Sequence, residues 1–390
     1  MIRSVLTLCT TSALASSAMA LPIAIGTNTG GSGNSEGIYM TDFDIKEGTF
    51  DEVVLAAKYD SPGFLALHPT KPVVYSVGRS EISRKGTIAA FQIGGTTQIT
   101  SGGVPVHSDK PLQLIGDAPS GGVNPCHLAV SPDGKSIAVA NYGDGSTTLL
   151  PITSLGVPQG PMLPIMKGEG TGPRTDRQEG PHAHGVYFAN RYLFVPDLGL
   201  DKVLTYYHAE LTPDQSKLLP NQPAFWASAP GAGPRHMAFT SDFGHAYIVN
   251  ELDNTITACA SDAINGKLET LHSVSTLPDG WKGNSTTAEI QIHPRGEFVY
   301  ASNRGHDSIA VYARDTSSGR LTRIQIAPCG GKTPRHFTIS PDGNWLLCAH
   351  QDSNTISALP LDPETGKLGE PSGSVSAPNP ICLLFLPTEF

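Results

Sequence analysis

The sequence predicts an all-β protein, a seven-bladed β-propeller with four strands in each blade. Three observations support this fold. A unit of roughly 45–60 residues recurs along the chain, and each unit places a tight turn between apolar runs. The 42 glycines and 32 prolines, set against 16% charged residues, indicate many short strands and turns. The two ends of the chain also complete one another. Together these features are typical of a radially repeated β architecture.

The repeat is clearest in three segments that each read as a first strand, a turn and the start of a second strand. They are 124–134, 233–244 and 333–343. In the same way, first strands open at Ser61, Pro125, Pro181, Pro234, Thr287 and Pro334. Apolar second strands follow at 73–77, 137–140, 192–195, 246–249, 298–301 and 345–349, and third strands are readable at 255–258, 308–312 and 355–359. Turns such as Asn265-Gly266 then lead into a fourth, outer strand.

The chain ends supply the remaining blade. Residues 23–28 resemble a second strand with no first strand before it, whereas 379–387 resemble a first strand with nothing after it. Pairing the C-terminal strand into the N-terminal blade closes the ring, and closure removes exposed sheet edges. Residues 21–390 are therefore predicted to form a single propeller domain. The longest insertions, 94–120 and 156–179, are candidates for a lid over one face.

Residues 1–20 are predicted to be a signal peptide. Arg3 provides a positive start, Val5 to Ala15 form an apolar stretch too short to span a bilayer, and Ala18-Met19-Ala20 fits a cleavage site. We expect cleavage after Ala20 and a periplasmic or secreted protein. No later stretch is long and apolar enough for a membrane helix, so no membrane partner is expected.

Charge and cysteine content exclude some classes of function. The net charge of −9 and the lack of a Lys/Arg run disfavour nucleic-acid binding, although a locally basic site for a small anion remains compatible with them. Five cysteines follow the signal peptide, an odd number without CxxC spacing: Cys126, Cys259, Cys329, Cys348 and Cys382. We interpret them as small buried residues in strands and expect no structural zinc. A monomer is expected.

Residues that share a phase of the repeat should share a location. The first strand of every blade lines the central channel, so one phase should form a ring of Phe64, His127, His184, His236, Glu289, His336 and Cys382. A second ring, after the second strand, should hold Tyr142, Asp197, Glu251, Arg304 and Gln351. Arg235 and Arg335 flank the first ring. Polar groups gathered at a channel mouth predict a ligand site there.

Several of these runs resemble the seven-bladed lactonase family, which includes propeller-type 6-phosphogluconolactonases and the fungal 3-carboxy-cis,cis-muconate lactonizing enzyme. The runs are 181–184, 233–236, 250–252, 302–308 and 333–337, and the resemblance covers essentially the whole mature chain. It implies a lactone hydrolase that opens a sugar-derived or carboxylated lactone without a cofactor or metal. The partner implied is a small anionic lactone or sugar acid.

The resemblance also implies catalytic residues: a histidine, two arginines and a glutamate. The histidine falls within His182-Ala183-His184, and His184 is in the ring phase; the others match Arg235, Arg304 and Glu251. An imidazole suits the activation of water, and a guanidinium suits an oxyanion or a substrate anion. Glu251 either orients the imidazole or acts as base itself, and the sequence leaves both open. The predicted substrate-binding residues are His182, His127, His236, Glu289, Arg335 and His336.

Other interpretations remain open at this point. The same groups would serve a lactonizing cycloisomerase, and a non-catalytic propeller would bind a ligand with the same basic pocket. In another interpretation, the channel histidines only hydrogen-bond between blades, and Asp197 is a hydrogen-bonding residue at a blade tip. His182 and His184 on one strand would ligate a metal together with Glu289 or Asp197. The Gly33–Gly37 run matches G-x-S-x-G, but no strand and helix frame it.

Overall fold

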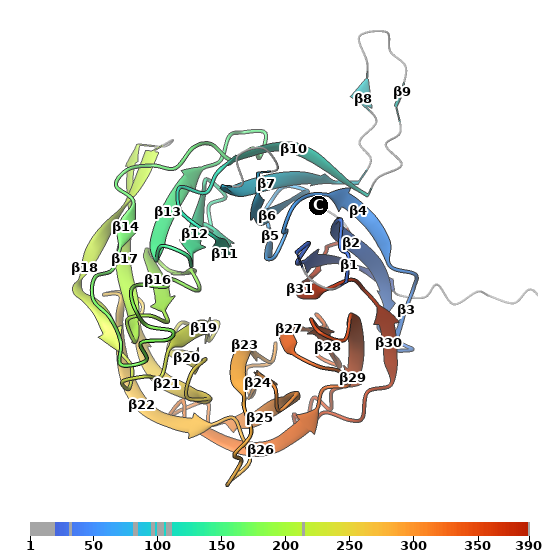
Figure 1. Cartoon of the computed structure of the whole chain (residues 1–390), viewed down its shortest axis with the longest axis vertical. Coiled ribbons are helices and arrows are strands. Elements are labelled where there is room, and N and C mark those ends of the chain that lie inside the picture. The colour runs from blue at the N-terminus through green and yellow to red at the C-terminus, as the bar shows by residue number, and fades with distance from the viewer. Residues whose placement is uncertain are drawn as a thin grey trace, which may run out of the picture.

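The computed structural model describes residues 20–30, 33–80, 85–94, 98–99, 105–106, 111–212 and 215–388. Within these ranges every regular element is a strand, and seven antiparallel sheets surround a central axis (Figure 1). This arrangement is a seven-bladed β-propeller, as the repeat predicts. None of the described residues form a helix of the length and apolar character needed to cross a membrane. The predicted signal peptide lies outside the described residues except for Ala20, the first residue of β1.

Each blade runs from an inner to an outer strand. Blade 1 holds β31 (Pro380–Phe385), β1 (Ala20–Thr27) and β2 (Gly37–Asp44), with its outer edge shared by β3 (Thr49–Phe50) and β4 (Val54–Lys58). Blade 2 holds β5 (Leu65–Leu67), β6 (Val73–Arg79), β7 (Gly86–Ile93) and β10 (Leu112–Pro119). Blade 3 holds β11 (Pro125–Val130), β12 (Ser136–Asn141), β13 (Ser146–Pro151) and β14 (Met166–Lys167). Blade 4 holds β15 (Tyr187–Ala189), β16 (Tyr192–Asp197), β17 (Lys202–Thr212) and β18 (Gln215–Ala227).

The last three blades are the most regular. Blade 5 holds β19 (Pro234–Phe239), β20 (His245–Asn250), β21 (Thr255–Asp262) and β22 (Lys267–Ser275). Blade 6 holds β23 (Thr286–Ile292), β24 (Phe298–Arg304), β25 (Ser308–Arg314) and β26 (Leu321–Pro328). Blade 7 holds β27 (Pro334–Ile339), β28 (Trp345–His350), β29 (Thr355–Pro360) and β30 (Gly373–Ser376). A separate pair, β8 (Gln98–Ile99) and β9 (Pro105–Val106), lies outside the ring (Figure 1).

Ring closure is achieved by the two chain ends. β31 pairs with β1 in antiparallel register, with Ile23 opposite Phe385 and Ile25 opposite Leu383. The C-terminal strand is thus the innermost strand of the N-terminal blade, which confirms the closure expected from the sequence. β1 is hydrogen-bonded to β31 on one side and to β2 on the other, so this strand has no free edge.

The hydrophobic core lies between adjacent blades. One cluster joins Tyr300 and Val311 of blade 6 to Phe337 and Leu346 of blade 7, and all four are fully buried. Similar clusters occur at the other blade boundaries. Because each sheet buries both faces against its neighbours, a single blade has too little core to be stable alone. The packed ring therefore holds the channel-facing strand ends in fixed positions.

The two long insertions behave differently. The hairpin β8–β9, in the insertion 94–120, projects away from the ring, so the expectation that this insertion covers a face is not met where the structure describes it (Figure 1). The insertion 156–179, by contrast, brings Arg177 to the channel mouth. Only this second insertion contributes a described side chain to the cavity there.

Candidate active site

A β-bulge at the start of the first strand aims side chains at the channel mouth. The strand registers shift at Cys126 in blade 3, Arg235 in blade 5 and Arg335 in blade 7. The residue before the strand has a positive φ, 55° at Asn124 and 60° at Thr333. A bulge leaves one residue out of the ladder and turns its side chain. Cys126, Arg235 and Arg335 all line the cavity at the mouth.

The predicted first ring forms a floor beneath this cavity, and four of its seven members line it, namely Phe64, His184, His236 and His336. Its members are linked by contacts around the axis: Phe64, His127, His184, His236, Glu289, His336 and Cys382. The ring centroids of Phe64 and His127 are 4.0 Å apart, and those of His184 and His236 are 5.3 Å apart. Glu289 Oε2 lies 3.0 Å from His236 Nδ1. Side chains far apart in sequence therefore converge as the repeat phase predicts.

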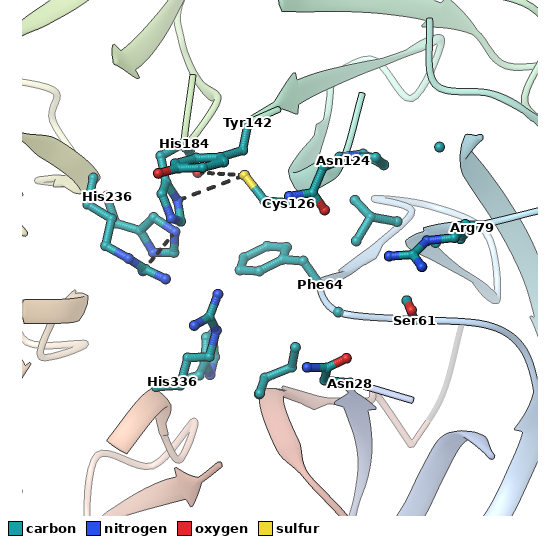
Figure 2. Close-up of a pocket in the computed structure, with 18 of the residues that line it drawn as sticks. Asn28, Ser61, Phe64, Arg79, Asn124, Cys126, Tyr142, His184, His236 and His336 are labelled. Atoms are coloured by element: carbon teal, nitrogen blue, oxygen red, sulfur yellow. Dashed lines mark hydrogen bonds between the residues drawn. The ribbon is translucent and has the colours of Figure 1, made fainter. Parts of the chain in front are cut away.

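The cavity above this floor has a volume of about 580 Å³. Five arginines and a single carboxylate line it, namely Arg79, Arg177, Arg235, Arg304 and Arg335 with Glu251. In Figure 2, His184, Tyr142 and His236 lie on one side of Phe64, and Arg79, Ser61 and Asn28 lie on the other. The pocket is thus strongly positive on a protein whose net charge is −9.

Glu251 is held by three arginines. Its Oε1 lies 2.7 Å from Arg177 Nη2, and its Oε2 lies 3.0 Å from Arg235 Nε and 3.1 Å from Arg304 Nη2. Burial opposes ionisation of this carboxyl, but the charges of Arg304, Arg235 and Arg177 outweigh burial and lower its pKa to about 2. A carboxylate so strongly stabilised as an anion is a weak proton acceptor near neutral pH.

His184 is a buried imidazole beside this cluster. Burial, together with the charges of Arg235, His236 and Arg335, lowers its pKa well below the usual value for histidine. Its Nδ1 lies 3.9 Å from Cys126 Sγ, and its Nε2 lies 4.0 Å from Glu251 Oε2, which is too long for a hydrogen bond. The imidazole is therefore uncharged at neutral pH and able to accept a proton. Burial raises the pKa of the Cys126 thiol to about 12, so this thiol stays protonated.

Arg335 has no carboxylate partner among the described residues. Its Nη1 donates a hydrogen bond of 3.4 Å to Gln351 Oε1. Burial and repulsion from Arg235 and Arg304 lower its pKa to about 9. A largely buried guanidinium without a counter-ion is costly unless a ligand supplies the negative charge. Arg335 therefore carries charge and hydrogen-bond donors that the protein itself leaves largely unused.

The predicted substrate-binding residues occupy different depths. His236, His336 and Arg335 line the cavity, whereas His127 and Glu289 belong to the floor and are absent from its lining. His127 instead borders a second cavity along the first strands. The pocket thus exposes three of the six side chains to an incoming molecule.

His182 lies behind Tyr142 rather than in the cavity. Its ring stacks on that of Tyr142 at 4.6 Å between centroids, its Nδ1 is 2.8 Å from the Tyr142 carbonyl oxygen, and its Nε2 is 3.0 Å from Glu179. His182 thus fixes the wall of the pocket, and a joint metal site with His184 is not formed. Among the described residues, one group of three side chains has metal-ligand spacing, Cys329, Cys348 and His350, and none of the three lines the cavity.

The prediction that Asp197 belongs to the second ring is wrong by one residue of the repeat. Asp197 precedes the positive-φ residue Asp201 by four positions, as Asn250 precedes Asn254. Asp197 therefore matches the buried Asn250, and Leu198 matches Glu251. The Asp197 carboxylate accepts hydrogen bonds from the backbone N–H groups of His182 at 2.8 Å and Leu200 at 3.1 Å, and the residue is fully buried. It is a structural residue of the blade tip and not part of the second ring.

Several pocket residues are absent from the sequence-based set, and three of them are Arg177, Asn28 and Arg79. Arg177 comes from an insertion, so no repeat phase points to it. Asn28 directly follows β1, Arg79 is the last residue of β6, and both belong to the second ring. The run Val73–Arg79 parallels Phe298–Arg304 residue by residue, and this match would have identified Arg79 as the counterpart of Arg304.

Comparison with known proteins places this geometry in a family. The family model described as "Lactonase, 7-bladed beta-propeller" matches residues 22–385. The chain belongs to this lactonase family. It is 34% identical over 366 residues to the 6-phosphogluconolactonase of Bacillus subtilis (strain 168), covering 93% of this chain and 97% of that protein. It is also 34% identical over 342 residues to a 6-phosphogluconolactonase of Formosa agariphila, covering 85% and 90% of the two chains.

A solved structure shares the whole architecture. The periplasmic gluconolactonase of Pseudomonas aeruginosa superposes with a TM-score of 0.84 at 29% identity, covering 94% of this chain and 99% of that one. The identities and coverage agree with the fold and with the resemblance noted from the sequence.

Proposed function

We propose that this lactonase-family protein hydrolyses a lactone of a sugar acid, with His184 as general base. The observation that carries the proposal is a neutral imidazole beside three guanidinium groups that one carboxylate holds in place. The names of the relatives from Bacillus subtilis and Formosa agariphila support the same reaction class.

The reaction follows from the contacts at the mouth. Water bound beside His184 loses a proton to the imidazole, and its oxygen attacks the lactone carbonyl carbon. The negative charge that develops on the carbonyl oxygen is stabilised by guanidinium donors such as Arg335, which has one hydrogen bond, to Gln351, among the described residues. The ring C–O bond then breaks, and the alkoxide takes the proton from His184. The product is the open hydroxy acid.

Glu251 acts as an anchor in this scheme. With a pKa of about 2 and three ion pairs, it fixes Arg177, Arg235 and Arg304 and partly offsets their mutual repulsion. Of the two bases that the sequence leaves open, Glu251 and His184, we therefore propose His184. All groups in the scheme are protein side chains and water, so we propose that no metal or cofactor takes part.

Hydrolysis of a lactone panel by the purified protein, followed as proton release in weakly buffered solution, tests the proposal. We expect turnover of at least one aldonolactone, and we expect His184→Asn to lower kcat by about 10²–10⁴-fold, the usual contribution of a general base. Loss of muconate absorbance, measured in parallel, reports lactonizing activity. Turnover of muconate but not of lactones, or a His184→Asn enzyme with undiminished kcat, would overturn the assignment.

We also propose export of the protein. The N-terminal pattern at residues 1–20 supports it, and the structurally similar Pseudomonas aeruginosa protein is described as periplasmic. Expression of the full-length chain in a Gram-negative host, followed by fractionation and N-terminal sequencing, should give a periplasmic protein that begins at Leu21. Recovery of an uncleaved chain from the cytoplasm would contradict export.

A further inference from the structure

Glu289 is a buried carboxylate in the floor of the channel. It belongs to β23 of blade 6, whose register shifts between Thr287 and Ile290, and this irregularity turns the Glu289 side chain toward the axis. The residue is only 6% exposed and does not line the cavity. Glu289 is predicted from the sequence to bind substrate, but from this position it acts on a substrate only through other side chains.

The contact with Arg235 determines which nitrogen of His236 carries the proton. Arg235 Nη1 lies 3.2 Å from His236 Nε2, and a guanidinium has only donors, so Nε2 is the acceptor. Burial holds the pKa of His236 well below its usual value, so the ring is neutral and its proton is on Nδ1. Nδ1 then donates a hydrogen bond of 3.0 Å to Glu289 Oε2. Burial raises the pKa of Glu289, but the direction of this bond is fixed by Arg235 in either charge state of the carboxyl.

Other N–H groups also point at the Glu289 carboxyl. Oε1 accepts a hydrogen bond of 3.0 Å from the backbone N–H of Ile290. His336 Nδ1 accepts the backbone N–H of Leu383 at 3.2 Å, so the proton of this ring is on Nε2, which lies 3.5 Å from Glu289 Oε2. An amide in place of the carboxyl would therefore bring a donor against at least one of these N–H groups.

Arg235 is held through its Nε and Nη1 atoms. Nε donates to Glu251 Oε2 at 3.0 Å, and Nη1 donates to the Ala288 carbonyl oxygen at 2.6 Å and to His236 Nε2. Nη2 forms no hydrogen bond with the described residues, and Arg235 lines the cavity. The donors on Nη2 are thus left for a ligand, and the contacts of Nε and Nη1 set their direction because the guanidinium is planar.

We propose that Glu289 is a positioning residue of the active site: it fixes the Nδ1–H tautomer of His236, whose Nε2 lone pair then holds the Arg235 guanidinium in place. The inference rests on the proposed hydrolysis, in which guanidinium donors stabilise the carbonyl oxygen. A continuous chain of buried hydrogen bonds runs from Glu289 through His236 and Arg235 to Glu251. It connects the floor of the channel to the groups at the mouth.

Glu289→Gln should reverse this chain. The Gln oxygen is needed by the Ile290 N–H, so the NH₂ group faces His236 Nδ1 and moves the imidazole proton to Nε2, against Arg235 Nη1. We expect kcat/KM for glucono-δ-lactone and 6-phosphoglucono-δ-lactone to fall about 10–100-fold, the effect of losing one charge-assisted hydrogen bond. Glu297→Gln, in the exposed turn between β23 and β24 of the same blade, is the matched control and should keep the wild-type kcat/KM.

A distorted floor would also lower activity, so two further readouts are needed. Long-range ¹H–¹⁵N spectra of ¹⁵N-histidine-labelled protein report the tautomer, with the His236 signals assigned by their absence in His236→Gln. We expect the Nδ1–H form in the wild type and the Nε2–H form in Glu289→Gln. The second readout is a double-mutant cycle. In the His236→Gln background, Glu289→Gln should change kcat/KM less than about twofold, because Glu289 acts through His236.

Three results would overturn the proposal: an Nε2–H tautomer in the wild type, an unchanged tautomer in Glu289→Gln, or an effect of Glu289→Gln that persists in the His236→Gln background. If Glu289→Gln does not fold, Glu289→Asp takes its place. The shorter carboxylate keeps its charge but retracts from His236, so the loss of kcat/KM should be smaller and should again vanish in His236→Gln.

Failure of the proposed function would look different. A wild type that hydrolyses neither lactone contradicts hydrolysis of these substrates. The tautomer of His236 is measured without substrate, so the spectra of the wild type and of Glu289→Gln still decide whether Glu289 holds His236 toward Arg235.

Discussion

Replacing Glu251 with glutamine tests whether this residue anchors the three arginines or acts as the general base. The side chain keeps its shape and loses its charge, so Arg177, Arg235 and Arg304 lose their common counter-ion while two of them remain buried. Removing one partner of a buried ion pair costs about 3–5 kcal/mol, because the remaining charge is left uncompensated. At an unfolding entropy of about 2 cal/mol/K per residue, that loss corresponds in a domain of this size to a fall in Tm of about 4–6 °C.

Two measurements are needed on this variant. Thermal unfolding followed by circular dichroism gives the change in Tm, and the pH dependence of kcat/KM gives the ionisation of the base. As an anchor, Glu251 affects the height of the pH profile but not its acidic limb, which belongs to His184. As a base, Glu251 would carry the acidic limb, and the limb would disappear in Glu251→Gln.

Glu364→Gln is the control, because Glu364 is exposed and pairs with Arg295 on the surface. A surface pair contributes about 0–1 kcal/mol, so the Tm of this variant should stay within about 2 °C of the wild type. The reasoning is refuted if Glu251→Gln unfolds at the wild-type temperature, or if its acidic limb is lost while stability is retained. Adding Arg304→Gln to Glu251→Gln should recover part of the lost stability, since it removes one of the uncompensated charges.

Three further predictions use the same assays. Acidification from pH 7 to 6 should lower Tm, because burial holds the pKa of His127, His184 and His236 below the unfolded value, and each of these histidines costs at most about 1.4 kcal/mol of stability per pH unit. Burial raises the pKa of Asp197 and of Asp253 to about 6, which opposes this loss at lower pH, and a Tm that rises from pH 7 to 6 would contradict the prediction. Dialysis against a chelator should leave kcat unchanged, and a loss restored by a divalent cation would show that a metal takes part. Arg177→Gln should lower kcat/KM about tenfold with little change in Tm, because Arg177 is one-third exposed and makes the shortest contact to Glu251; a large fall in Tm would assign it a structural role.

The fold could be read from the sequence because each blade repeats the same physical pattern. Apolar first and second strands, a tight turn and an outer hairpin recur with enough regularity to count blades, and the unmatched strands at 23–28 and 379–387 fix how the ring closes. The convergence of His184 and His236 follows from phase alone, since equal positions in a ring of equal units face one axis.

The site was less completely predictable, for three identifiable reasons. Arg177 lies in an insertion, where repeat phase carries no information. Asp197 was misplaced because it is the last residue of β16, as Asn250 is of β20, whereas the second-ring position is one residue later. The roles of Glu251 and His184 depend on pKa values that burial and neighbouring arginines determine, and such distances exist only after folding.

The second ring shows how equal backbone positions produce an asymmetric site. Its seven members are Asn28, Arg79, Tyr142, Leu198, Glu251, Arg304 and Gln351. The fold supplies seven equivalent positions, but only blade 5 places a carboxylate there, and three arginines gather on it. That single carboxylate fixes where positive charge is compensated and where it is not. A negatively charged ligand therefore meets an asymmetric field in the channel, because the guanidinium groups that Glu251 compensates all lie on the side of His184.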